Sequence, residues 1–389
     1  MKVWLSRAGL AVALVLLVVV TVNASWWADP PPGVIRLIAH RGVAQLYDHQ
    51  GIGRDSCTAT RIEPPVHDYL ENTVRSIDAA WRLGADMVEI DVAPTADGRM
   101  AVFHDWTVDC RTEGHGETRS LTLAQLKSLD PGYGYTADGG KSFPLRGKQK
   151  GAIPSLQEVL RAFPGLPLLY NFKSKDPAEA DLLARELREA GRDPVKAGDG
   201  FYGAAAPVER IRKLYPAAWA WSMDGAKRCT KDYAKLGWLT KVPESCRNGV
   251  MFVPLNYQWA FAGWPNRLLQ RMNSVGAKVI VIGPTGGDAG TGLTLPEQLG
   301  DVPSTFKGYL WVGTCGPSAP PSAPTATSAP TPSSRRPKRG WSGGGNATDR
   351  HCERSEAIQE QLVHTREIWI AAAPAAPRND GLHLRGTAR

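Results

Sequence analysis

The sequence predicts an α/β fold, a TIM-type (β/α)8 barrel over about residues 33–315. Short runs rich in β-branched and aromatic residues alternate with helical patterns, as in βα units of a parallel sheet. The strand runs number eight, as in this barrel. A doubly wound sheet is disfavoured because no glycine-rich phosphate turn follows the first strand.

The predicted strands and helices follow one another along this region. Strands are expected at 34–39, 87–92, 168–172, 200–203, 218–223, 250–255, 278–282 and 309–312. Helices are expected between them at 72–83, 123–129, 155–162 and 177–190, with Asp176 capping the last and Pro177 in its first turn.

One connection departs from the alternation. The segment between Val92 and Met100 is too short for a parallel crossover, so a β-hairpin through Asp97-Gly98 is expected. A turn centred between those two residues predicts that Asp91 lies opposite His104. The barrel is therefore expected to carry a hairpin excursion and long strand-to-helix loops, such as residues 43–70.

The N-terminus has the pattern of an export signal. Lys2 and Arg7 precede an apolar run over 8–22, and Val22-Asn23-Ala24 is a candidate cleavage site. The uncharged stretch is also long enough to span a bilayer. Residues 1–27 are therefore either a removed signal or a membrane anchor. Both predict an extracytoplasmic protein, periplasmic or secreted, and the second predicts association with the inner membrane.

Export predicts paired cysteines, because the compartment is oxidising. The cysteine spacing is not that of a zinc site. Two disulfides are expected in the body, Cys57 with Cys110 and Cys229 with Cys246.

The C-terminal part is predicted to lie outside the barrel. Residues 316–334 form a Pro/Ser/Ala linker, a composition that cannot bury enough apolar surface to fold. Residues 335–389 are expected to be a disordered basic tail, in which HCERSEAIQ resembles translated interspersed repeats. This tail holds four of the chain's eight net positive charges, and Lys2 and Arg7 hold two more. The nearly neutral body excludes a nucleic-acid partner.

Candidate catalytic residues gather at strand ends. Glu89 and Asp91 share one face of their strand and would repel each other unless a cation held them. Calcium and magnesium prefer such oxygen ligands, although a salt-bridged strand end remains an alternative. His40 and His104 also end β-rich runs, where barrel enzymes place catalytic groups, and suit acid and base catalysis.

Five motifs occur in order: His40-Arg41-Gly42, Glu71-Asn72-Thr73, Glu89-Ile90-Asp91-Val92, Thr95-Ala96-Asp97-Gly98 and Val102-Phe103-His104-Asp105. Together they resemble the glycerophosphodiester phosphodiesterase family. The resemblance implies a TIM barrel, a divalent ion, and hydrolysis of glycerophosphodiesters to sn-glycerol 3-phosphate and an alcohol.

The resemblance also implies roles for single residues. His40 and His104 would be general acid and base, and Arg41 and Lys173 would bind the substrate phosphate. Glu89 and Asp91 would be metal ligands, and Glu71 would lie near the metal or position Arg41.

The sequence departs from the family at one ligand. Where the family has Glu-x-Lys, this chain has Asn171-Phe172-Lys173. An amide oxygen can ligate calcium or magnesium, so Asn171 stays a candidate third ligand in a site one negative charge poorer.

Other functions stay open at this stage. The barrel could bind phosphodiesters or lipids without catalysis, or act as a phospholipase C- or D-like lipid phosphodiesterase. The expected substrate is a small glycerophosphodiester or a lysophospholipid-type molecule. His49, His67 and His115 lie in loops, where surface or hydrogen-bonding roles are expected. The sequence does not predict the oligomeric state.

Overall fold

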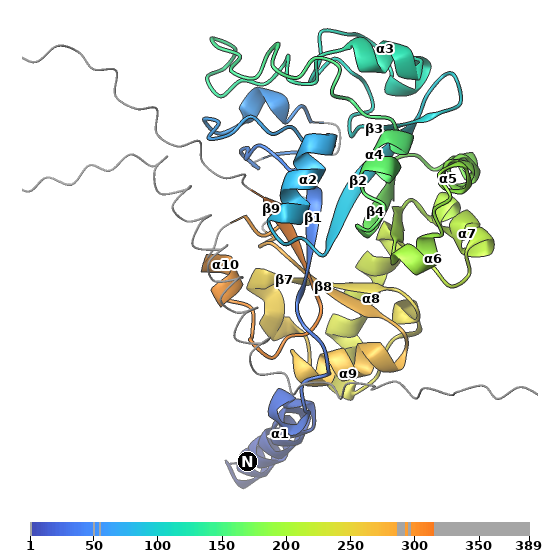
Figure 1. Cartoon of the computed structure of the whole chain (residues 1–389). Coiled ribbons are helices and arrows are strands. Elements are labelled where there is room, and N and C mark those ends of the chain that lie inside the picture. Colours follow the sequence, from blue (N-terminus) through green and yellow to red (C-terminus); the bar gives the residue numbers. More distant parts are fainter. Residues whose placement is uncertain (1, 50, 54–55, 286–291, 295–296, 315–389) are drawn as a thin grey trace, which may run out of the picture.

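The computed structural model describes residues 2–49, 51–53, 56–285, 292–294 and 297–314 (Figure 1). Eight parallel strands form the barrel wall in the order β6-β5-β4-β2-β1-β9-β8-β7. Their bounds are β1 Arg36–Val43, β2 Met87–Pro94, β4 Leu168–Phe172, β5 Gly200–Gly203, β6 Trp219–Ser222, β7 Val250–Pro254, β8 Lys278–Ile282 and β9 Tyr309–Thr314. The first and last strands in the chain, β1 and β9, pair with each other, as a barrel requires. The predicted fold class is confirmed.

The barrel is closed by side chains at its one seam. Within the described residues, no strand ladder joins β6 to β7. There the ring of Trp221 meets that of Phe252 edge-on, with centroids 5.5 Å apart. Trp221 also stacks on Tyr202 at 4.7 Å, inside a cluster that includes Ile38, Leu169 and Ile280. The interior is thus a packed core rather than a pore.

Helices surround the wall (Figure 1). Their bounds are α2 Val74–Arg82, α4 Leu156–Ala162, α5 Ala178–Glu189, α6 Pro194–Ala197, α7 Ala205–Leu214, α8 Met223–Leu236, α9 Asn266–Ser274 and α10 Glu297–Gly300. Thr73 and Ser155 have extended backbones and cap α2 and α4 through capping boxes. These helices therefore begin later than predicted. α5 begins at Ala178 with Pro177, and not Asp176, as its N-cap, so Pro177 precedes the first turn in which it was expected. Asp176 Oδ1 accepts from the Ala178 backbone N–H.

The hairpin exists, but its predicted register is wrong by one residue. β3 (Met100–Val102) pairs antiparallel with β2, with Val92 opposite Val102. The Phe103 N–H donates to the Asp91 carbonyl, so Phe103, and not His104, lies opposite Asp91. The cause is a three-residue turn centred on Asp97, in which Gly98 takes a left-handed φ of 68°.

Two long insertions cover the mouth of the barrel, at the end opposite α9 (Figure 1). Residues 44–70 include η2 (Ala59–Arg61), and residues 105–153 include η3 (Thr118–Ser120) and α3 (Leu123–Ser128). The predicted Cys57–Cys110 disulfide joins the two insertions. Beside it they share a small core that includes Ala59, Leu70 and Tyr135.

The predicted Cys229–Cys246 disulfide is also confirmed. It ties α8 to η5 (Glu244–Cys246). Cys315, Cys352, the linker at 316–334 and the tail at 335–389 lie outside the described residues.

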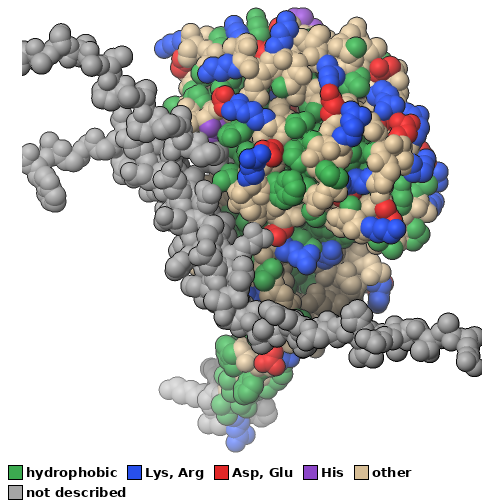
Figure 2. Space-filling model, viewed as in Figure 1, with side chains coloured by type: hydrophobic (Ala, Val, Ile, Leu, Met, Phe, Trp, Pro, Cys, Tyr) green, Lys and Arg blue, Asp and Glu red, His purple; other side chains and the backbone are tan. Residues whose placement is uncertain are grey.

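The N-terminal helix α1 (Lys2–Asn23) leads through η1 (Ser25–Trp27) into contact with the barrel's lower end. The Asn23 amide donates to the Trp238 carbonyl, and the Asn266 N–H donates to Ser25 Oγ. Apolar side chains of α1 stand exposed, as Figure 2 shows. None of the described helices is long and apolar enough to cross a membrane. The signal or anchor role of residues 1–27 stays a prediction.

Candidate active site

A buried carboxylate pair from β2 forms the centre of the site. Glu89 and Asp91 are both fully buried. Glu89 accepts hydrogen bonds from the Tyr202 hydroxyl at 2.7 Å and the Arg41 backbone N–H at 3.1 Å. The strand register places Glu89 beside His40 of β1, the residue before Arg41. It also places Asp91 beside Asn171 of β4.

Asp91 has the richer set of partners. The side-chain amides of Asn72 and Asn171 donate to it at 2.9 and 2.8 Å. Arg41 Nε lies 3.1 Å and Lys173 Nζ lies 3.4 Å from its two carboxylate oxygens. Both predicted phosphate-binding cations therefore lie beside the carboxylate pair.

The two carboxylates differ in charge state. Burial, followed by the neighbouring Asp91, raises the pKa of Glu89 to about 8. Burial also acts on Asp91, but Lys173 and Arg41 outweigh it and hold the Asp91 pKa well below its ordinary value. Asp91 is therefore anionic at neutral pH, whereas Glu89 faces His40 instead of a lysine or arginine side chain at ion-pair distance within the described residues.

The two predicted histidines reach the same mouth from different strands. His40 Nε2 lies 3.9 Å from Glu89 Oε2, and the His40 side chain is 26% exposed. His104 follows β3, and its Nδ1 lies 2.6 Å from Asp105 Oδ1. Burial and then Arg41 lower the pKa of both imidazoles, and His104 also lowers that of His40. The two rings thus lie within electrostatic range of each other.

Backbone strain marks the segments around the site. Arg41 and Asn72 have left-handed φ values of 63° and 59°, which are uncommon outside glycine. Gly42 follows with φ 77°, and a Cβ there would lie 2.7 Å from Ser76 backbone and hydroxyl atoms. The chain after β1 therefore packs tightly on the start of α2. Such strain clusters at functional sites because surrounding contacts hold it.

Glu71 does not join the carboxylate pair. Its Oε1 lies 2.9 Å from Arg41 Nη1 and 3.2 Å from Arg111 Nη2. Of the two roles left open for Glu71, this geometry favours positioning Arg41. The other loop histidines make hydrogen bonds or ring contacts elsewhere: His67 with Gln45, His115 with Asp109 and His49 with Tyr47.

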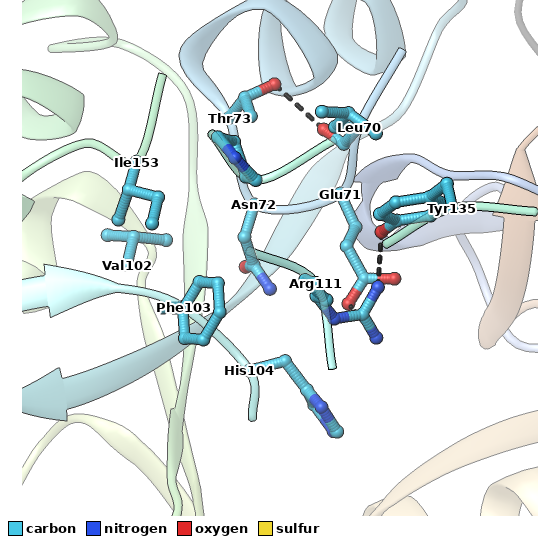
Figure 3. A pocket seen from close by; sticks show the side chains of 11 residues that line it. Leu70, Glu71, Asn72, Thr73, Val102, Phe103, His104, Arg111, Tyr135 and Ile153 are labelled. Carbon is cyan, nitrogen blue, oxygen red and sulfur yellow. Dashed lines mark hydrogen bonds and ion pairs between the residues drawn. The ribbon is translucent and has the colours of Figure 1, made fainter. Parts of the chain in front are cut away.

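A recess opens beside His104 under the insertions (Figure 3). Leu70, Phe103 and Ile153 contribute apolar wall, and the side chains of Glu71, Arg111 and Tyr135 converge on one another. Sequence reasoning did not single out Arg111 or Tyr202. Strand alternation in 200–203 would have suggested Tyr202, and the place of Arg111 directly after Cys110 would have drawn attention to it.

The side chains of the site bear on whether it can hold a divalent ion. In the part of the chain that the structure describes, no three His, Cys, Asp or Glu side chains form a metal-binding group. The two buried carboxylates nevertheless offer oxygen ligands, and Asn171, at the same level of β4, now turns its amide nitrogen to Asp91 and would have to turn its oxygen to a bound ion. Carboxylate and amide oxygens of this kind suit a hard cation.

Comparison with known proteins agrees with the sequence resemblance. Residues 40–197 match the model of the glycerophosphoryl diester phosphodiesterase family. Over 124 residues the chain is 38% identical to a glycerophosphodiester phosphodiesterase of Caldanaerobacter subterraneus, covering 31% of this chain and 47% of that protein. It is 34% identical over 110 residues to one from Bacillus subtilis, covering 28% of this chain and 36% of that protein.

The chain thus spans half or less of the length of these relatives. Among solved structures, that of a glycerophosphodiester phosphodiesterase from Agrobacterium tumefaciens has a TM-score of 0.46 and 20% identity, covering 72% of this chain and 96% of that one. The family match includes the candidate-site residues from His40 to Lys173, but not Tyr202.

Proposed function

From the match of residues 40–197 to the glycerophosphoryl diester phosphodiesterase family, we propose that this chain hydrolyses glycerophosphodiesters to sn-glycerol 3-phosphate and an alcohol. The observation that carries the proposal is the meeting of His40 and His104 with the buried Glu89–Asp91 pair at the barrel mouth. Barrel enzymes perform their chemistry at this end.

Arg41 and Lys173 are proposed to hold the substrate phosphate. Both contact Asp91, and their side chains are only 11% and 19% exposed. A phosphodiester anion placed between them would gain charge-assisted hydrogen bonds in a mostly desolvated setting.

His40 is proposed as the general base and His104 as the general acid. Water attacks phosphorus and gives its proton to His40 Nε2, while the bond from phosphorus to the alcohol oxygen breaks. His104 enters this step protonated on both nitrogens, a form that Asp105 and the bound phosphodiester anion stabilise; Nε2 gives its proton to the leaving oxygen, and Nδ1 keeps its proton on Asp105. Exchange with solvent then resets both rings.

Glu89, Asp91 and Asn171 are the residues proposed to hold calcium or magnesium. Such an ion, when bound, would neutralise phosphate charge and stabilise the transition state. We further propose an extracytoplasmic location, which the two disulfides support.

Phosphorus NMR of the products of glycerophosphocholine tests the proposal. Purified full-length chain, with and without chelator, is expected to release glycerol 3-phosphate. A cyclic phosphate would indicate phospholipase-like chemistry instead, and binding without any product would indicate a non-catalytic barrel.

A further inference from the structure

We propose that Arg111 is a positioning residue that orients both His104 and Arg41, each through one carboxylate. The inference rests on the proposed function, because it assigns how two groups of that site are held. Arg111 itself is not placed to touch the reacting atoms.

Every nitrogen of the Arg111 guanidinium has a partner. Nε donates to Asp105 Oδ2 at 2.8 Å, and Nη1 donates to the Tyr135 hydroxyl. Nη2 donates to Thr58 Oγ1 at 2.8 Å and lies 3.2 Å from Glu71 Oε1. The side chain is 3% exposed, so these contacts form away from bulk water.

The first route leads to His104. Asp105 is a bridge, with Oδ2 on Arg111 and Oδ1 on His104 Nδ1 at 2.6 Å. A carboxylate held on one side fixes the ring orientation and the proton on Nδ1, which leaves Nε2 for the substrate. Burial opposes the charge on Asp105, but Arg111 and His104 together outweigh it and lower the Asp105 pKa.

The second route leads to Arg41. Glu71 Oε1 faces Arg111 on one side and Arg41 on the other, at 3.2 and 2.9 Å. Because Glu71 is 8% exposed, loss of either arginine would leave its charge poorly compensated. Glu71 thus holds Nη1 of Arg41, while Nε of the same side chain lies on Asp91.

The insertions and their disulfide complete the arrangement. Cys57 precedes Thr58 and Cys110 precedes Arg111, so the Cys57–Cys110 bond brings a donor and its acceptor together. A planar guanidinium can serve two carboxylates at once, whereas a lysine ammonium is a single point charge. The position therefore requires arginine.

The test compares Arg111→Ala with Arg192→Ala in the full-length protein. Arg192 is an equally buried control, 5% exposed and paired with Asp199, which binds the Leu168 N–H at the opposite end of β4. Arg111→Ala is expected to lower kcat about a hundredfold and to raise KM. Added guanidinium is expected to recover much of kcat.

Arg192→Ala is expected to lower the melting temperature, with kcat per folded molecule unchanged and no response to guanidinium. If Arg111→Ala does not fold, Arg111→Lys replaces it, with a similar loss of kcat expected. Parent-like kcat and KM in the folded Arg111 variant, or equal guanidinium rescue in both variants, would overturn the inference.

Variants of the two carboxylates, Asp105 and Glu71, test the two routes one at a time. Asp105→Asn is expected to lower kcat with little change in KM, and Glu71→Gln to raise KM. In the Arg111→Ala/Asp105→Asn double variant, kcat is expected to fall no further than in Asp105→Asn alone. Fully additive losses would indicate independent structural roles and overturn the proposal.

A proton NMR measurement needs no turnover. The His104 Nδ1 proton is expected as a far-downfield signal in the parent and to be lost in the Arg111 variant. Persistence of that signal would overturn the positioning role. A parent that shows the signal but hydrolyses no glycerophosphodiester would refute the proposed function and leave the positioning supported.

Discussion

Asp91 has the largest set of polar partners described in the site. The cations of Arg41 and Lys173 and the side-chain amides of Asn72 and Asn171 all contact it. Asp91→Ala is therefore expected to abolish calcium and magnesium binding in calorimetric titration. Asn171→Glu, which adds a carboxylate at the same level of β4, is expected to tighten it. Metal binding by Asp91→Ala at parent strength would contradict the proposed ligand set.

His67 gives a prediction on acid stability. Its Nδ1 accepts from the Gln45 amide at 3.0 Å, and burial lowers its pKa to about 4 from 6.5. The folded pKa is depressed, so unfolding takes up a proton, and stability present above pH 6.5 is lost towards pH 4. The loss between pH 7.5 and pH 5 is expected to be about 1–2 kcal/mol in urea unfolding.

His67→Asn keeps an acceptor but does not titrate. Between pH 7.5 and pH 5 the unfolding free energy of this variant is expected to fall by about 1–2 kcal/mol less than that of the parent. Equal pH slopes in the two proteins would show that His67 does not carry the effect.

The placement of a residue was predictable where it depends on a short segment. His40 and Arg41 lie in β1 and Glu89 and Asp91 lie in β2, so strand alternation and register bring them together. Arg111 contacts residues far away in sequence, through two insertions whose folding no local pattern describes. That part of the site required the structure.

At the scale of elements, the hairpin shows how a turn decides side-chain placement. Strand 87–92 was predicted from its residues, but the register depends on whether the turn has two or three residues. Gly98 adopts φ 68° in the longer turn. His104 thus leaves the ladder instead of pairing with Asp91, and its ring turns to Asp105.

The turn predicts the cost of Gly98→Ala. A Cβ at Gly98 would meet only Arg185 at 3.9 Å, so the cost comes from the left-handed backbone alone. A loss of about 1 kcal/mol is expected in urea unfolding. Gly165→Ala is the control, because a Cβ there meets nothing within 4 Å and its φ is not left-handed. Equal stability of both variants would contradict this reading of the turn.

At the scale of the whole molecule, the two disulfides serve different ends of the barrel. The chain-entropy model gives about 4 kcal/mol for the 53-residue separation of Cys57–Cys110 and about 3 kcal/mol for the 17-residue separation of Cys229–Cys246. Only the first lies beside Arg111. Replacing both cysteines of either disulfide with serine is expected to lower the melting temperature.

The two double serine variants are expected to differ in turnover. The Cys57/Cys110 pair alone is expected to lower kcat, by about tenfold or more, because it loosens the insertion that holds Arg111. Parent-like kcat in that variant, measured well below its melting temperature, would show that the disulfide only stabilises the fold.

Barrel closure was predictable because each strand carries its own local pattern, and the pairing of β1 with β9 follows from eight strands. The layer of insertions was not, since its order depends on a disulfide and on buried contacts between distant segments. The barrel supplies the carboxylates and cations, and the insertions supply the supports of His104.

His40 and His104 are proposed to act as base and acid on a glycerophosphodiester held by Arg41 and Lys173. The most direct measurement is steady-state turnover of glycerophosphocholine by His104→Ala, with calorimetry showing that metal still binds. The kcat of this variant is expected to be at least about a hundredfold below that of the parent. Hydrolysis at the parent rate would contradict it.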